Sequence, residues 1–488
     1  MQVDYYPDSL GTIDTYENYD ELYDYVALPQ ASTSMLGSWI VSMTSFFVGT
    51  VLLMRIDDGI GPALVGSLFL GAALLIHMLP GLNNRYARRG FLLSFCICVL
   101  ITGTVQTYAQ IALGEPHTTV DAIRFYHTCR GGPAAHYLNE VLPVAIWQHL
   151  YAIYNKVSSH EGPWLGILVN CLLVGFSGSI TVSIGRHLFG DDGVRLRRLG
   201  TLFAVCGIFW LYGSIFVRDS FALFLNVLTL WGIVRCLALP STKNLIIMLA
   251  TLLFGFICME YIRDGLKPMF VLFGLMALFS WTRKVRSSVF IFLLPLLVLT
   301  IGLMLLPLLK SSLGIVTETV VEKSVKYGSR YEEAGSLGQT LVAGQPVPIR
   351  LLVGPFYILI NPIPLWIGFQ FGLKEYVWLK SWHGIYLVWI TPAIILGLMD
   401  FFKRAIRGGP EAPVACYLAF YAVITLLAIA VTSLENRHHG QFLPAMLILA
   451  VIPDKYDPST MNKARFIKIG WFSFVIVGHL AWYALKFF

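Results

Sequence analysis

The sequence predicts an all-α protein, a polytopic bundle of membrane-spanning helices. Of its 488 residues, 56% are hydrophobic and only 13% are charged, whereas about 25% of the residues in soluble domains are charged. The mean hydropathy is +0.69 and the apolar character recurs along nearly the whole chain, so lipid must surround most side chains. Backbone groups in lipid must be paired within their own segment, and the alternating pattern of a β-barrel is absent, so the spanning elements are helices.

Apolar runs of a length that can cross a bilayer recur from residue 37 to the end of the chain. A spanning helix needs roughly 20 apolar residues, and no repeat or linker divides the runs into separate domains. They cover 37–55, 61–80, 90–113, 163–185, 199–217, 220–238, 244–262, 267–281, 288–309, 351–372, 383–402, 413–433, 438–453 and 468–487.

The segment 1–36 differs from everything after it. It contains seven acidic residues and no lysine or arginine, and we expect it not to act as a cleavable signal sequence. Such a composition is typical of a disordered acidic arm, which is either a solvated tail or a docking segment for a partner. We therefore expect an arm at 1–36 and a single transmembrane catalytic domain at 37–488.

Lysine and arginine residues gather in five short loops, after the second, fourth, eighth, eleventh and thirteenth runs. Positive charge in short loops marks the cytoplasmic side of a membrane protein, which predicts a cytoplasmic N-terminus. The same loops account for the net charge of +7, so we do not expect nucleic-acid binding.

All five basic loops can lie on the cytoplasmic side only if one of the runs between them does not cross the membrane. The run 351–372 contains Gly354, Pro355, Pro362 and Pro364, and proline interrupts helical hydrogen bonding. We expect this run to be re-entrant or interfacial, which leaves about 13 transmembrane helices. Two long loops, 114–162 and 310–350, then lie outside and are expected to carry outer-face helices.

The unusual polar residues fall on this outer face. Asp121, near Tyr126 and His127, is a candidate general base, although an amphipathic surface helix would also explain it. The pairs Arg218–Asp219 and Arg263–Asp264 lie between consecutive runs, where ionisable residues are costly and suggest a site; a tight interfacial turn is the alternative. Arginine presents a planar fork suited to phosphate oxygens.

Further cations stand at two other points of the outer face. Arg350 precedes the proline-rich run, and Arg437 precedes His438 and His439. Adjacent histidines rarely close a metal site without further ligands, so a phosphate cradle or a proton shuttle is the better interpretation. The chain has no phosphate-binding loop, dinucleotide fingerprint or zinc-protease motif, and we expect neither a cofactor nor a metal.

Four of these features, in this order, resemble the Wzy-type repeat-unit polymerases and related GT-C membrane glycosyltransferases of bacterial polysaccharide assembly. They are Asp121 with Tyr126-His127, Phe-Val-Arg-Asp-Ser at 216–220, Ile-Arg-Leu-Leu-Val-Gly-Pro with Asn-Pro-Ile-Pro at 349–364, and Asn-Arg-His-His…Pro at 436–444. The resemblance covers most of the chain sparsely. Such proteins transfer sugars carried on polyprenyl phosphate or pyrophosphate at the extracytoplasmic face of the inner (plasma) membrane.

The resemblance implies a role for each candidate residue. Its phosphate contacts would be Arg218, Arg263, Arg350 and Arg437. Asp121 would be the base, with His438 or His439 as the alternative, and Tyr126, His127, Asp219 and Asp264 would support them. The expected partners are a polyprenyl-linked sugar, membrane lipid and other polysaccharide-assembly proteins. An O-antigen ligase, a lipid-linked oligosaccharide flippase and an assembly subunit remain open as alternatives.

Overall fold

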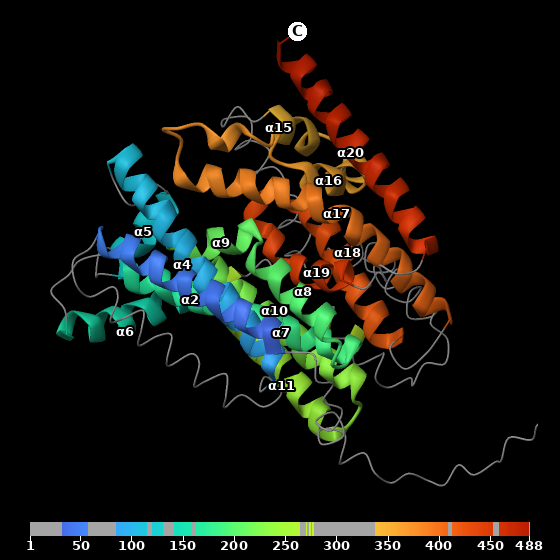
Figure 1. Cartoon of the computed structure of the whole chain (residues 1–488), viewed down its shortest axis with the longest axis horizontal. Helices are drawn as coiled ribbons and strands as arrows, with labels where there is room; N and C mark the ends of the chain where they lie inside the picture. Colours follow the sequence, from blue (N-terminus) through green and yellow to red (C-terminus); the bar gives the residue numbers. More distant parts are fainter. Residues whose placement is uncertain are drawn as a thin grey trace, which may run out of the picture.

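The computed structural model is predominantly helical, with no strand, in the part of the chain that it describes (Figure 1). It describes residues 32–56, 84–114, 120–129, 141–157, 163–263, 270, 273–274, 276–277, 337–407, 412–451 and 458–487. Eight of the helices in these ranges are long and apolar enough to cross a membrane. They are α2 (Ser32–Met54), α4 (Arg85–Leu113), α7 (Trp164–Phe189), α10 (Asp219–Ala238), α11 (Thr242–Arg263), α17 (Glu375–Arg407), α18 (Ala412–Thr432) and α20 (Pro458–Phe487).

The protein is therefore a membrane-embedded helical bundle, but the count of about 13 spans is not confirmed. The predicted runs 61–80 and 288–309, most of 267–281 and most of the acidic arm lie outside the described residues. Two other runs are described, and they are not continuous helices.

The runs 199–217 and 438–453 are both broken in the middle. The first becomes α8 (Gly193–Ala204) and α9 (Gly207–Ser214), and the second becomes the 3-10 helix η3 (Asn436–Gln441) followed by α19 (Leu443–Ala450). Helices of eight residues extend only about 12 Å, far short of the hydrocarbon thickness of roughly 30 Å. Both runs are apolar, and α9 and α19 are buried in the bundle. Neither run forms a single continuous helix of spanning length, so a crossing by these runs stays a prediction.

The proline-rich run is also interrupted. Helix α16 (Val347–Ile360) has 14 residues, about 21 Å of helix. The next residue, Asn361, has the extended backbone that a residue before proline favours. The peptide bonds before Pro362 and Pro364 are cis, and a short 3-10 helix, η2 (Ile367–Phe369), follows. A straight crossing helix is thus absent here, while the position of this run in a membrane stays a prediction.

The two long loops that are predicted to lie outside contain helices where they are described. Helices α5 (Val120–Cys129) and α6 (Val141–Val157) lie in the first loop, and α15 (Leu337–Ala343) lies in the second. Residues 310–336 lie outside the described part of the chain.

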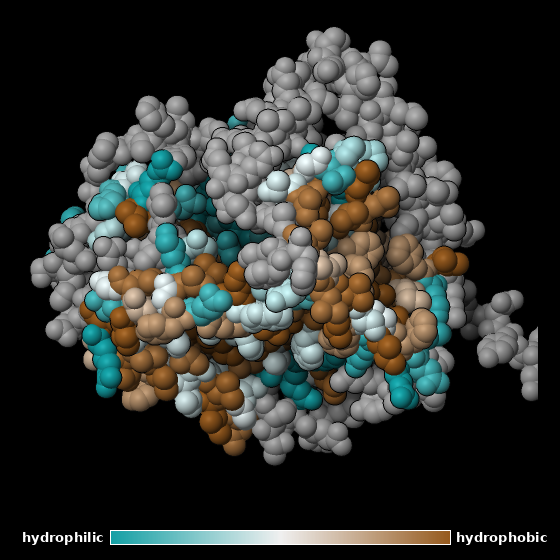
Figure 2. All heavy atoms as spheres, turned by 90° about the horizontal axis from the view of Figure 1, so that it is seen from above, coloured by the Kyte–Doolittle hydropathy of each residue, from teal (hydrophilic) through white to brown (hydrophobic). Residues whose placement is uncertain are grey.

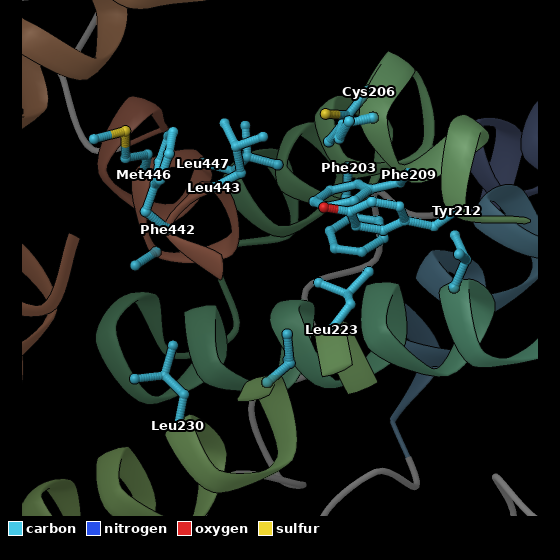
Figure 3. Close-up of a cluster of buried hydrophobic side chains, with 14 of the residues drawn as sticks. Phe203, Cys206, Phe209, Tyr212, Leu223, Leu230, Phe442, Leu443, Met446 and Leu447 are labelled. Atoms are coloured by element: carbon cyan, nitrogen blue, oxygen red, sulfur yellow. The ribbon is translucent and has the colours of Figure 1, made fainter. Parts of the chain in front are cut away.

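The centre of the bundle is formed by α7, α10 and α18, with the broken helices α8, α9 and α19 packed among them. Side chains of α8, α9, α10 and α19 meet in one hydrophobic cluster (Figure 3), in which the rings of Phe203 and Phe209 stack with centroids 4.1 Å apart. Helices α2, α11 and α20 are mostly exposed. Hydrophobic side chains cover much of the face shown in Figure 2, as expected for a surface in contact with lipid.

Helices α2 and α4 cross with their backbones in close approach. A Cβ added to Gly103 would lie 2.7 Å from the carbonyl oxygen of Gly49, and one added to Gly49 would lie 2.7 Å from the backbone of Leu100. Small residues at a helix crossing permit this distance. We predict that Gly103→Ala destabilises the protein by about 1–3 kcal/mol through overpacking, measured by thermal unfolding in detergent. Gly37→Ala on α2 is the control, because nothing lies within 4 Å of its added Cβ; equal effects would contradict the prediction.

Candidate functional site

Four separate elements, α5, α10, α11 and η3, bring charged side chains together around η3. We call this group the ionic cluster. It contains Asp121 of α5, Asp219 of α10, Arg263 of α11, Glu435 directly before η3, and Arg437 and His438 of η3. The start of α10, the end of α11 and the end of α18 all meet here, so the cluster lies at one end of the bundle.

The inner half of the cluster is centred on Arg263. Its guanidinium donates to Asp219 Oδ1 at 2.9 Å and to His438 Nε2 at 2.8 Å. Because a guanidinium can only donate, Nε2 must accept, and a neutral His438 therefore carries its proton on Nδ1. Asp219 is only 6% exposed. Its carboxylate lies in the first turn of α10, where the positive end of the helix dipole also stabilises a negative charge. Arg218, the residue before α10, lies within electrostatic reach of His438.

The outer half of the cluster is centred on Arg437 and is open to solvent. Arg437 donates to Asp121 Oδ2 at 2.9 Å and also pairs with Glu435. The Asp121 side chain is 49% exposed, so a ligand from solution can reach it. This ion pair also holds α5, part of the first long loop, against η3. One arginine thus faces two carboxylates in the more exposed half of the cluster.

His439 is buried in the bundle. Its Nδ1 lies 3.0 Å from Nε2 of His383 on α17, and both rings are completely buried. Of the three residues predicted as candidate bases, Asp121 is half-exposed, whereas His438 and His439 are both buried. The choice of base among them stays a prediction.

Neutral side chains fix the position of η3. The Tyr212 hydroxyl donates to the carbonyl oxygen of Arg437 and accepts from the Gly440 amide. Asn361 donates to Asn436 Oδ1 at 2.5 Å, and Asn226 donates to the carbonyl oxygen of Gln441 at 2.9 Å. Irregular backbone inside a bundle requires such partners, and with them the charged side chains of η3 are held in place without a ligand.

The turn that carries Arg218 and Asp219 is held in the same way. Asn170 of α7 donates to the carbonyl oxygens of Ile215 and Val217 at 3.0 and 2.9 Å, and its Oδ1 accepts from Ser220. These bonds satisfy the backbone between α9 and α10, where helical pairing is interrupted, and so place Asp219 toward Arg263.

Three predicted residues have other positions. Arg350 donates to the carbonyl oxygens of Gln345 and Val431, which places its guanidinium at the C-terminal end of α18. Tyr126 packs against the rings of Tyr151 and Phe216. His127 is exposed beside Tyr126. Asp264 lies outside the described residues.

Sequence reasoning did not select Lys380, His383 and Tyr212. Lys380, on α17, is half-buried and lies within electrostatic reach of Glu435 and Arg437. Lys380 and His383 were detectable as isolated ionisable residues at the edge of an apolar run, which is a signal for function in membrane helices. Tyr212 gave no signal, because a tyrosine inside an apolar run is ordinary.

The pKa of His438, which lies outside the eight candidate spans, is lowered well below 6.5. Burial is the main cause, followed by the charge of Arg263 and then of Arg437. The unfolded chain, with a pKa near 6.5, therefore binds this proton more tightly than the folded protein does. The contribution of neutral His438 to the free energy of unfolding is therefore fully present above about pH 6.5. It is lost as the pH falls from there toward the folded-state pKa of His438.

We predict that His438→Gln, which keeps an acceptor for Arg263, reduces this loss. The difference between variant and wild type approaches about 1.4 kcal/mol per pH unit below pH 6.5. Thermal unfolding measured from pH 7.5 to 4.5 checks it. If the two proteins lose stability in parallel, His438 does not titrate on unfolding.

Within the described residues, no three His, Cys, Asp or Glu side chains are grouped so that they could hold a metal ion. The chain matches no family model, no curated protein and no solved structure.

Proposed function

We propose that the protein is a membrane glycosyltransferase that uses sugars linked to polyprenyl phosphate or pyrophosphate to build a cell-surface polysaccharide. The observation that carries the proposal is the ionic cluster. Arg263 and Arg437, with Arg218 and Lys380 nearby, gather at one end of a lipid-embedded bundle. A lipid-linked phosphate would present its charge at that position while its chain remains in the bilayer.

The reaction assigns a role to each half of the cluster. An acceptor hydroxyl attacks the anomeric carbon, the bond from this carbon to the phosphate oxygen breaks, and the lipid (pyro)phosphate leaves with the bonding electrons. The hydroxyl proton passes to the Asp121 carboxylate. Arg263 and Arg437 stabilise the negative charge on the leaving phosphate. The exposed pair Arg437–Asp121 costs little to rearrange when phosphate arrives, because such pairs are worth about 0–1 kcal/mol.

The extracytoplasmic position of the site and the bacterial inner membrane as its location belong to this proposal. A repeat-unit polymerase, a ligase and a single-sugar transferase would all use the same cluster, since each binds a lipid-linked phosphate. We favour the polymerase.

A transporter of lipid-linked oligosaccharides is the second candidate, and one observation favours it. Transporters place their substrate sites at discontinuous helices, and here the broken elements α8–α9 and η3–α19 contact one another beside the ionic cluster. A flippase would also need cations along a path between the two faces, whereas the described site cations gather at one end.

The test is a glycan size profile of a host strain from which the gene has been deleted. This strain is compared with the same strain carrying a complementing copy of the wild-type gene. Loss of long chains with survival of single capped repeats would support a polymerase. Loss of all extended glycan would instead indicate a ligase, a single-sugar transferase or a flippase, and transfer by purified protein would separate these. An unchanged profile would contradict the proposal.

A further inference from the structure

Arginine residues from two distant parts of the sequence form one patch at the other end of the bundle. We call this group the basic patch. It contains Arg85, Arg88 and Arg89 at the start of α4, Arg186 at the end of α7, and Arg195, Arg197 and Arg198 in α8. The nearby described acids are Asp191 and Asp192, which pair with Arg186 and Arg195. Seven arginines and two aspartates give the patch a net charge of +5.

Direct contacts bring the two groups of arginines together. The Arg89 guanidinium donates to the carbonyl oxygen of Arg197 at 2.8 Å and to the Thr201 hydroxyl at 3.1 Å. The Tyr86 ring lies against Gly193, where an added Cβ would meet the hydroxyl at 2.4 Å. Loop arginines that only set topology act during insertion and need not meet in the folded protein. Here the fold holds them side by side.

The basic patch is separate from the ionic cluster. Asn170, which holds the turn before Asp219, lies near the start of α7, and Arg186 lies near its end. Sixteen residues of helix separate them, or about 24 Å. This distance is close to the thickness of a bilayer core, so the patch meets the opposite leaflet, which the loop charges predict to be cytoplasmic.

The surroundings of the patch fit the headgroup region of a membrane. Helix α8 buries Leu196 and Leu199 against the bundle, while its arginines are half-buried and Val194 is 67% exposed. An apolar residue exposed among arginines is typical of helices at the membrane interface. Like charges held together repel one another, and anions at the surface relieve that repulsion.

We propose that the basic patch is a binding surface for anionic phospholipid headgroups of that leaflet. Clusters of four to eight basic residues beside transmembrane helices attract such lipids, and arginine binds the phosphate through paired donors. The proposal does not depend on the glycosyltransferase reaction, since it concerns the opposite end of the bundle.

The test compares thermal unfolding of the full-length protein in nanodiscs of phosphatidylcholine alone and of phosphatidylcholine with phosphatidylglycerol. We expect phosphatidylglycerol to raise the Tm of the wild type by about 3 °C or more. Arg88→Gln with Arg195→Gln, one change in each group, should remove most of this rise. The Asp192 carboxylate still accepts from the backbone amides of Val194 and Arg195 in this variant, so α8 keeps its cap.

Two matched variants separate the patch from total charge. Lys463→Gln with Lys468→Gln removes the same charge from α20 on the same predicted side, and it should keep the full rise. Arg88→Lys with Arg195→Lys keeps the charge and should keep most of the rise. An equal rise in the glutamine variant, an equal loss in the α20 variant, or the same rise from inorganic phosphate in phosphatidylcholine nanodiscs would overturn the proposal.

Discussion

Replacing Arg263 with glutamine is expected to cost about 3–5 kcal/mol of stability and to abolish glycan extension. The change leaves the Asp219 carboxylate without its partner at a position that is 6% exposed, and it removes the donor to His438. A buried charge that loses its partner is strongly destabilising. Chemical unfolding in detergent measures the first effect, and the glycan profile of complemented cells measures the second.

A second substitution tests this reason directly. Asp219→Asn in the Arg263→Gln background removes the unpaired charge, so the double variant should be more stable than Arg263→Gln alone. Arg404→Gln on α17 is the control, since Arg404 pairs with Asp400 on an exposed surface and should cost at most about 1 kcal/mol. A stability of Arg263→Gln equal to that of the wild type would show that the buried pair is not formed.

Replacing Arg437 with alanine should change the stability little but should cause a large loss of activity. Its ion pairs with Asp121 and Glu435 are partly exposed, so they contribute little to folding. If Arg437 contacts the leaving phosphate, its removal should slow transfer by about 10²–10³-fold. The measurement is the rate of transfer from a lipid-linked sugar by purified protein.

The lysine variant distinguishes charge from geometry. Arg437→Lys keeps the positive charge but loses the fork that contacts two oxygens at once, so we expect it to recover only part of the rate. A wild-type rate in Arg437→Ala would remove Arg437 from the reaction.

The local sequence was a better guide to which residues meet than to how many helices cross. Arg218, Asp219 and Arg263 were selected because ionisable residues are costly between apolar runs. Arg437 and His438 were selected because an arginine beside two histidines suggests a phosphate cradle or a proton shuttle. Asp219, Arg263, Arg437 and His438 meet around η3, and Arg218 lies within electrostatic reach of His438. The reason is general: a charge near the membrane core needs a partner, and the available partners are other such charges. The count of spans is not confirmed, because the runs 61–80 and 288–309 lie outside the described residues and hydropathy alone does not distinguish a buried short helix such as α19 from a helix in lipid.

Positions that depend on three-dimensional packing were not predictable. The contact between the His439 and His383 rings joins residues 56 positions apart, and no pattern in either segment indicates the other. Arg350 was selected as a phosphate contact, yet it binds two backbone carbonyls, because the end of α18 supplies acceptors that only the fold reveals. The partners of η3, such as Tyr212 and Asn226, were hidden for the same reason.

Helix α20 lies at the edge of the molecule and ends at the C-terminus (Figure 1). Only 11% of its spanning window is buried, and its inward contacts involve few side chains. Trp471 donates to the carbonyl oxygen of Val388, Val475 packs in the same small cluster, and His479 contacts Leu365 and Trp366. Evolution can therefore exchange most positions of α20 among apolar residues at little cost. Across related sequences, variation should be greatest on this helix. The positions 471, 475 and 479, which are four residues apart and face the bundle, should vary less than the rest.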